Sequence, residues 1–235
     1  MTQILESFLK LYKLKADSND IPTHTKVSGG KYKIPEDKLD EFFELYHNDV
    51  FIHDNDSTLT EANSKITQIK IDLDFRYVME DNIARRIYTP EMIEEIIKLY
   101  IVSIHKYLHV ARSNMIAFVM EKSGPMYYSS KGKNDPKTGL KVIKDGIHIM
   151  FPSIVTHSKI AFKIRDDVIQ GIPKILDPLN LTNNYKEIVD ESVVDRNNWF
   201  LYGSTKANQP AYLVSSIYKY DLTDDTITLN NIPVS

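Results

Sequence analysis

The sequence predicts an α/β fold of the mixed, α+β kind, because helical and extended hydrophobic patterns alternate along its 235 residues. Apolar residues make up 42% and charged residues 26% of the chain, which is typical of a globular protein with a sizeable core. Neither an internal repeat nor a long linker interrupts the pattern. We therefore expect helices and strands in one large domain or in two small lobes.

The first 65 residues predict a helical and hairpin region. Ile4 to Leu14 places apolar residues at helical spacing, and "THTKVSGGKYKIP" reads as a turn or hairpin that Pro35 closes. "PEDKLDEFFELYHND" follows as a second amphipathic helix. Its apolar side consists of Leu39, Phe42, Phe43 and Tyr46.

Residues 66–235 predict an α/β core. Ile66 to Phe75 favours a strand, since β-branched and aromatic residues alternate with polar ones. Thr89-Pro90-Glu91 is typical of a helix start, and we expect this helix to end at about His109. The later expected elements are strands at "NMIAFVMEK" and "GIHIMFP", a helix from Ser158 to Ile175 weakened at Gly171, and strands at "WFLYGS", "AYLVSSIYKYD" and "TITL".

Composition excludes several classes of protein. The chain contains no cysteine, so disulfides and cysteine-containing zinc sites are excluded. An apolar run of about 18 residues, as a membrane span needs, is missing, and the N-terminus lacks a signal-peptide cleavage site. We expect an intracellular protein without a membrane partner. The net charge of -3 leaves only a local basic patch for polyanions, in the segment from 129 to 146 with Lys131, Lys133, Lys137, Lys141 and Lys144.

Asp72 and Asp74 end the first strand of the core. Residues two apart in a strand share a face, which puts the two carboxylates about 6 to 7 Å apart. Divalent cations favour such hard oxygen ligands. Burial of both carboxylates without a cation is unfavourable, because like charges repel and lose hydration. The alternative interpretation is a solvated strand end.

Two further segments carry polar side chains suited to phosphate. In "KDGIHIMFP", Lys144 and His148 flank Gly146, which lets a ligand approach the backbone. The alternative is a histidine satisfied inside a sheet. In "VDESVVDRNNWFLYGSTK", the acids are Asp190 and Asp195 and the phosphate-binding candidates are Arg196 and Lys206. This segment lacks the glycine spacing of a Walker A loop, and a surface hairpin is its plainer interpretation.

Taken in order, these motifs resemble the archaeo-eukaryotic primase superfamily. The chain is most similar to the primase domain at the N-terminus of the primase-helicases of large nucleocytoplasmic DNA viruses, and it also resembles eukaryotic primase-polymerases. The resemblance implies that Asp72, Asp74 and Asp190 hold two Mg²⁺ or Mn²⁺ ions. It implies that His148, Arg196 and Lys206, with Lys144 and Gly146, bind the phosphates of an NTP or dNTP.

The chain departs from the family pattern at two points. Gly146 stands where much of the superfamily has serine, so a backbone amide replaces a hydroxyl contact. Asp195 rivals Asp190 as the third acid, because the spacing from Asp190 to "LYGS" is one residue short of the primase-polymerase pattern.

The resemblance also implies architecture and partners. The expected fold has two lobes, an RRM-like catalytic sheet and an active site in the cleft between the lobes. The expected activity is primer synthesis on single-stranded DNA, with Lys131, Lys133, Lys137 and Lys141 as candidates for template contact. A C-terminal superfamily 3 helicase is expected in a longer protein, working in the host cytoplasm. The alternatives are a catalytically silent DNA-binding or replisome-docking module and a glycosyltransferase, which leaves His148 and Lys206 unexplained.

Overall fold

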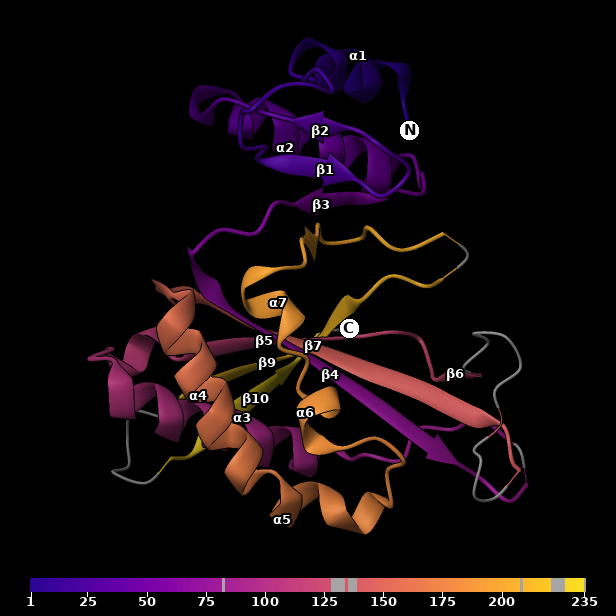
Figure 1. The fold of residues 1–235 in the computed structure, drawn as a ribbon, viewed down its shortest axis with the longest axis vertical. Helices are drawn as coiled ribbons and strands as arrows, with labels where there is room; N and C mark the ends of the chain where they lie inside the picture. The colour runs from indigo at the N-terminus through magenta and orange to yellow at the C-terminus, as the bar shows by residue number, and fades with distance from the viewer. Residues whose placement is uncertain (82, 128–133, 135–138, 208, 221–226, 235) are drawn as a thin grey trace. The chain divides into compact units, whose positions relative to one another are not determined.

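The computed structural model describes residues 1–81, 83–127, 134, 139–207, 209–220 and 227–234, and its contacts divide into two compact units (Figure 1). Unit 1 contains residues 1–63 and 196–213, and unit 2 contains residues 64–195 and 214–235. Helices accompany antiparallel strand pairs in both units, so the predicted α+β fold class is confirmed. Among the described helices, none is both long and apolar enough for a membrane span.

Unit 1 combines a small sheet with two helices. The sheet has the order β2-β1-β3-β8, and the last strand comes from the returning segment 196–213, which the sequence-based division had placed in the C-terminal core. The elements are α1 (Gln3–Leu11), β1 (His24–Lys26), β2 (Lys31–Tyr32), η1 (Glu36–Lys38), α2 (Leu39–His47), the π-helical turn η2 (Asn48–Ile52), β3 (Leu59–Glu61) and β8 (Trp199–Phe200).

The returning segment is fixed to unit 1 by pairing and by buried polar contacts. Phe200 pairs with Thr60 in the sheet. The hydroxyl of Tyr46 donates to the backbone oxygen of Tyr202 at 2.8 Å, and it lies 2.8 Å from the Ser204 hydroxyl. These contacts explain why residues 196–213 leave unit 2, although no local pattern in the sequence predicts the return.

Unit 2 contains the larger sheet, in the order β10-β9-β5-β7-β4, with β6 paired to β7. Its strands are β4 (Ile66–Val78), β5 (Ile116–Glu121), β6 (Met126–Tyr127), β7 (Val142–His157), β9 (Leu213–Tyr220) and β10 (Leu229–Pro233). Its helices are α3 (Pro90–Tyr107), η3 (Arg112–Asn114), α4 (Ser158–Gly171), α5 (Pro173–Leu176), η4 (Asp177–Leu179), α6 (Tyr185–Ile188) and α7 (Ser192–Asp195).

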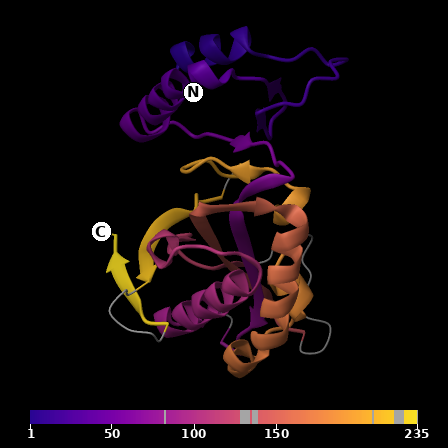
Figure 2. The ribbon, with the colours of Figure 1, turned by 90° about the vertical axis from the view of Figure 1, so that its left-hand side faces the viewer.

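One face of this sheet carries the hydrophobic core. Alternate side chains of β4, from Ile69 to Tyr77, are at most 3% exposed and belong to one cluster with residues of α3 and α4. Figures 1 and 2 show these two helices side by side along the sheet. α3 begins as predicted, because the Thr89 side chain accepts a hydrogen bond from the Met92 amide and Pro90 occupies the first turn.

Three element boundaries differ from the sequence prediction. The helix expected over 158–175 ends at Gly171 and restarts at Pro173, which has no amide hydrogen to continue α4. The strand expected at "WFLYGS" stops at Phe200, and a turn that contains Gly203 at a φ of +83° follows. The strand expected at "TITL" begins at Leu229 among the described residues.

Candidate active site

Asp72 and Asp74 lie on the face of β4 that points away from the hydrophobic core. Their neighbours Ile71, Leu73 and Phe75 are at most 2% exposed. The two aspartate side chains are 19% and 16% exposed, because successive strand residues point to opposite faces. A rigid strand therefore presents both carboxylates on one side.

The motif around His148 lies on β7, directly beside these acids. The antiparallel register pairs Asp72 with His148 and Asp74 with Gly146. The imidazole Nε2 of His148 is 3.6 Å from Asp72 Oδ1. The Nζ of Lys144 donates to Asp74 Oδ2 at 2.8 Å. The first two sequence motifs thus meet in one short stretch of sheet, with a basic group next to each carboxylate.

Asp190 reaches the same strand from its other edge. Its amide donates to the Asp72 backbone oxygen at 3.0 Å, and an antiparallel bridge joins Leu73 to Val189. Because paired residues share a face, this register places Asp190 on the side of Asp72 rather than on the buried side of Leu73. The Asp190 carboxylate accepts hydrogen bonds from the amide and hydroxyl of Ser192, at 2.9 and 2.6 Å. The rival Asp195 is an exposed residue at the end of α7.

A partly buried ionic network lies on the opposite face at this end of β7. Asp145 is 3% exposed and accepts a hydrogen bond from Arg86 Nε at 3.0 Å. Arg86 also lies 2.8 Å from the Glu121 carboxylate, which accepts a hydrogen bond from the Tyr88 hydroxyl at 2.7 Å. Burial raises the pKa of Tyr88, so the hydroxyl stays protonated as a donor. The network fixes the backbone between Lys144 and Gly146, since the Gly146 amide donates to Asp145.

The remaining basic candidates come from other segments of the chain. Arg196 and Lys206 are exposed residues of unit 1. The Nζ of Lys141 is 5.4 Å from the centre of the Tyr127 ring, a cation–π contact. Lys131, Lys133 and Lys137 fall outside the described residues.

The sequence pattern had not led us to two basic residues on the face of β4 that carries Asp72 and Asp74. Lys70 and Arg76 flank the aspartates on β4, and the spacing K-x-D-x-D-x-R puts all four side chains on one face. Lys70 is 6% exposed. Arg76 lies opposite Lys144 in the strand register, with its Nη1 3.9 Å from a Glu187 carboxylate oxygen. Alternation over seven residues was the signal that could have found them.

The donor set is compatible with a divalent cation. Carboxylates on one strand face, with a third acid bonded to the same strand, offer the hard oxygen ligands that Mg²⁺ and Mn²⁺ prefer. The Lys144 ammonium already places one positive charge against Asp74. Within the described residues, however, no three histidine or acidic side chains stand close enough together to form a ready metal cluster. Metal binding therefore remains a prediction.

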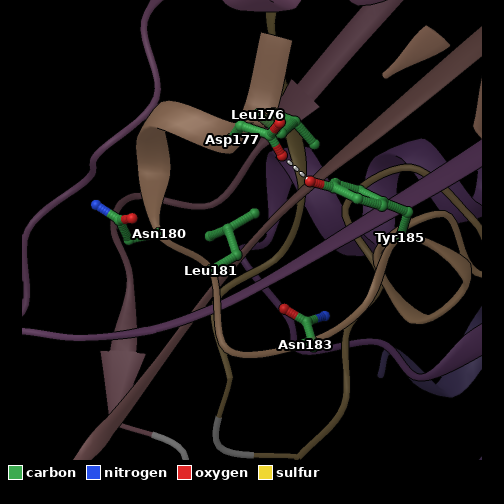
Figure 3. A pocket seen from close by; sticks show the side chains of 6 residues that line it. All are labelled: Leu176, Asp177, Asn180, Leu181, Asn183 and Tyr185. Carbon is green, nitrogen blue, oxygen red and sulfur yellow. Dashed lines mark hydrogen bonds between the residues drawn. The ribbon is translucent and has the colours of Figure 1, made fainter. Parts of the chain in front are cut away.

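A small pocket lies on the 176–185 turn of unit 2 (Figure 3). Its volume is about 240 Å³, and its lining residues are Leu176, Asp177, Asn180, Leu181, Asn183 and Tyr185. The Tyr185 hydroxyl donates to the Asp177 carboxylate at its rim. Asn183 connects this turn to β4, because its side chain bonds to the strand backbone.

The α+β fold and the paired-acid strand agree with a domain of the archaeo-eukaryotic primase (AEP) type. Residues 23–218 match the family described as the C962R protein N-terminal AEP domain, and the chain belongs to that family. The chain is also 34% identical, over 221 residues, to a protein of Acanthamoeba polyphaga mimivirus named "Putative helicase L207/L206". That alignment covers 91% of this chain and 22% of the mimivirus protein, so the chain spans about a fifth of its relative's length.

Proposed function

We propose that this domain is a divalent-metal-dependent nucleotidyltransferase that synthesises primers on a single-stranded DNA template. The observation that carries the proposal is the register of β4 and β7, which sets Asp72 and Asp74 beside His148 and Lys144 on one face of the sheet. Membership of the AEP family supports a primase-type activity for such a face.

In this proposal Asp72, Asp74 and Asp190 hold two Mg²⁺ or Mn²⁺ ions. When bound, such ions would supply Lewis-acid activation of a 3′-hydroxyl and positive charge for the phosphate oxygens. The strand backbone of β4 keeps the two carboxylates at a set separation, which limits reorganisation during the reaction. Release of Asp74 from Lys144 frees a carboxylate oxygen for a metal ion and an ammonium group for an anion.

The basic residues bind the nucleotide. His148 and Lys144 lie next to the acids and would contact the phosphates of the incoming NTP or dNTP, with Gly146 between them on the same strand. Arg196 and Lys206 are proposed to neutralise the rest of the triphosphate. Lys131, Lys133, Lys137 and Lys141 are proposed to follow the template backbone, which makes binding salt-sensitive and tolerant of sequence.

The length and name of the mimivirus relative support a larger assembly. We propose that the domain acts with a superfamily 3 helicase in the same polypeptide, during viral DNA replication in the host cytoplasm. The helicase would deliver single-stranded template to the domain.

One observation favours a second function, a catalytically silent DNA-binding or docking module. Lys144 pairs with Asp74 and His148 lies 3.6 Å from Asp72, so a basic side chain already stands beside each acid without an ion. The two proposals differ in whether the domain binds Mn²⁺ and makes product.

The test is primer synthesis on single-stranded DNA with Mg²⁺ or Mn²⁺ and labelled nucleotides. Wild type should make short oligomers, and Asp72→Ala and Asp74→Ala should each reduce synthesis to background with unchanged circular dichroism. Asp195→Ala is the matched control and should remain active, because Asp195 is an exposed residue at the end of α7. Wild-type-like synthesis by both aspartate variants would falsify the metal assignment. An inactive wild type that still binds single-stranded DNA would favour the silent module.

A further inference from the structure

The strand that carries the aspartates is the outer strand of its sheet. β7 lies on one side of β4, and the sheet order gives β4 no strand on the other side among the described residues. Edge amides and carbonyls need other partners, since unpaired buried backbone groups cost free energy. The residues that cover this edge therefore control the backbone beneath Asp72 and Asp74.

The segment 182–190 covers that edge without forming a continuous strand. At one end the Thr182 amide donates to the Arg76 oxygen at 2.7 Å, and at the other the Asp190 amide donates to the Asp72 oxygen at 3.0 Å. Between these two backbone bonds, the Asn183 side chain bonds to the strand edge in place of backbone groups. Its Nδ2 donates to the Asp74 oxygen at 2.9 Å, and its Oδ1 accepts from the Arg76 amide at 3.0 Å.

This pair of bonds holds the backbone on the C-terminal side of Asp74. The two strand groups flank Phe75, which is fully buried, so the bonds fix the peptide planes on both of its sides. The first of these planes includes the Cα of Asp74, so the bond to the Asp74 oxygen helps to set the direction of the Asp74 side chain. Asn183 is 9% exposed, which leaves little water to replace the bonds. A carboxamide carries its donor and its acceptor on separate atoms, so it can bond to both backbone groups at once.

We propose that Asn183 is a positioning residue for the candidate active site and that its carboxamide holds Asp74 in the orientation for a divalent cation. The inference rests on the proposed function, because it assumes that Asp74 is a metal ligand. Asn183 itself contacts the backbone of β4 and not the reacting groups.

The test compares Asn183→Ala with Asn183→Ser and with a matched control, Thr182→Ala. Thr182→Ala removes a 3.1 Å hydroxyl bond to the Arg76 oxygen but keeps the backbone bond to the same atom. Mn²⁺ affinity is measured by electron paramagnetic resonance, independently of synthesis. Amide hydrogen exchange at Arg76 reports on the bond itself, and thermal melting reports on the fold.

We expect Asn183→Ala to weaken Mn²⁺ binding about 10-fold, the lower end of the range for residues that orient a metal ligand. Exchange at the Arg76 amide should accelerate in the same variant. Asn183→Ser should give an intermediate affinity, because one hydroxyl replaces one of the two bonds. Thr182→Ala should bind Mn²⁺ like wild type.

Wild-type Mn²⁺ affinity in Asn183→Ala would overturn the positioning role. The positioning role would also be overturned if both Asn183 variants lost Mn²⁺ affinity only in proportion to their unfolded fraction. Asn183 would then have a structural role alone. The proposed function fails differently: wild type itself would then bind no Mn²⁺, and the positioning role would fall with it. Exchange at Arg76 separates the two cases, since it tests the hydrogen bond whether or not a metal binds.

Discussion

Arg165 supports the segment that carries Asp190, and its replacement by alanine should destabilise unit 2. Arg165 lies on α4 and is 6% exposed. Its Nε donates to the Val189 oxygen and its Nη2 to the Lys186 oxygen, both at 2.8 Å. The guanidinium thus holds the chain immediately before Asp190 through two carbonyl groups.

The magnitude follows from those two bonds. A hydrogen bond from a charged donor contributes about 1.5 to 3 kcal/mol, so the pair contributes about 3 to 6 kcal/mol. The Lys186 oxygen lies in an exposed turn of α6 and can regain water, which reduces the loss. We expect Arg165→Ala to lower the free energy of unfolding by about 2 to 4 kcal/mol.

The assay is urea unfolding followed by far-ultraviolet circular dichroism. Fluorescence of Trp199, the single tryptophan, follows unit 1 and gives an internal comparison. The matched control is Asp166→Ala, the next residue on α4, whose side chain is 66% exposed and 3.6 Å from Arg165. An exposed ion pair of this kind contributes at most about 1 kcal/mol. Arg165→Ala within about 0.5 kcal/mol of wild type would refute the reasoning.

Two further predictions concern unit 1. Burial lowers the pKa of His24, so the folded state binds fewer protons than the unfolded state. The contribution of neutral His24 to the free energy of unfolding should be fully present above the unfolded pKa of about 6.5, and it should decline as the pH falls below that value. Melting temperatures from pH 8 to pH 5 check this, and the decline should be smaller in His24→Leu; equal pH dependence in the two proteins would contradict it. Gly203→Ala should destabilise by about 1 to 3 kcal/mol, because φ is +83° and the new Cβ would lie 2.8 Å from Phe51 Cζ. Gly124→Ala, where nothing lies within 4 Å, is the control in urea unfolding, and similar midpoints for both variants would count against the strain.

Local pattern in the sequence determined the parts of the site that depend on one element. Alternation along β4 determined that Asp72 and Asp74 share a face, because side-chain direction in a strand has a period of two residues. The start of α3 was predictable for the same reason, since Thr89 and Pro90 act within a single turn.

Only the tertiary structure decided which distant residues meet that face. The pairing of Asp72 with His148, the bond from the Asp190 amide to Asp72, and the Asn183 carboxamide on β4 all depend on register between segments far apart in sequence. A shift of one residue would turn each side chain to the other face, and the burial that opposes such a shift exists only once the sheet has formed. The return of residues 196–213 to unit 1 could not be predicted from local sequence for the same reason. Contacts with the folded first unit stabilise this return, and they include the bond from Tyr46 to the returning chain.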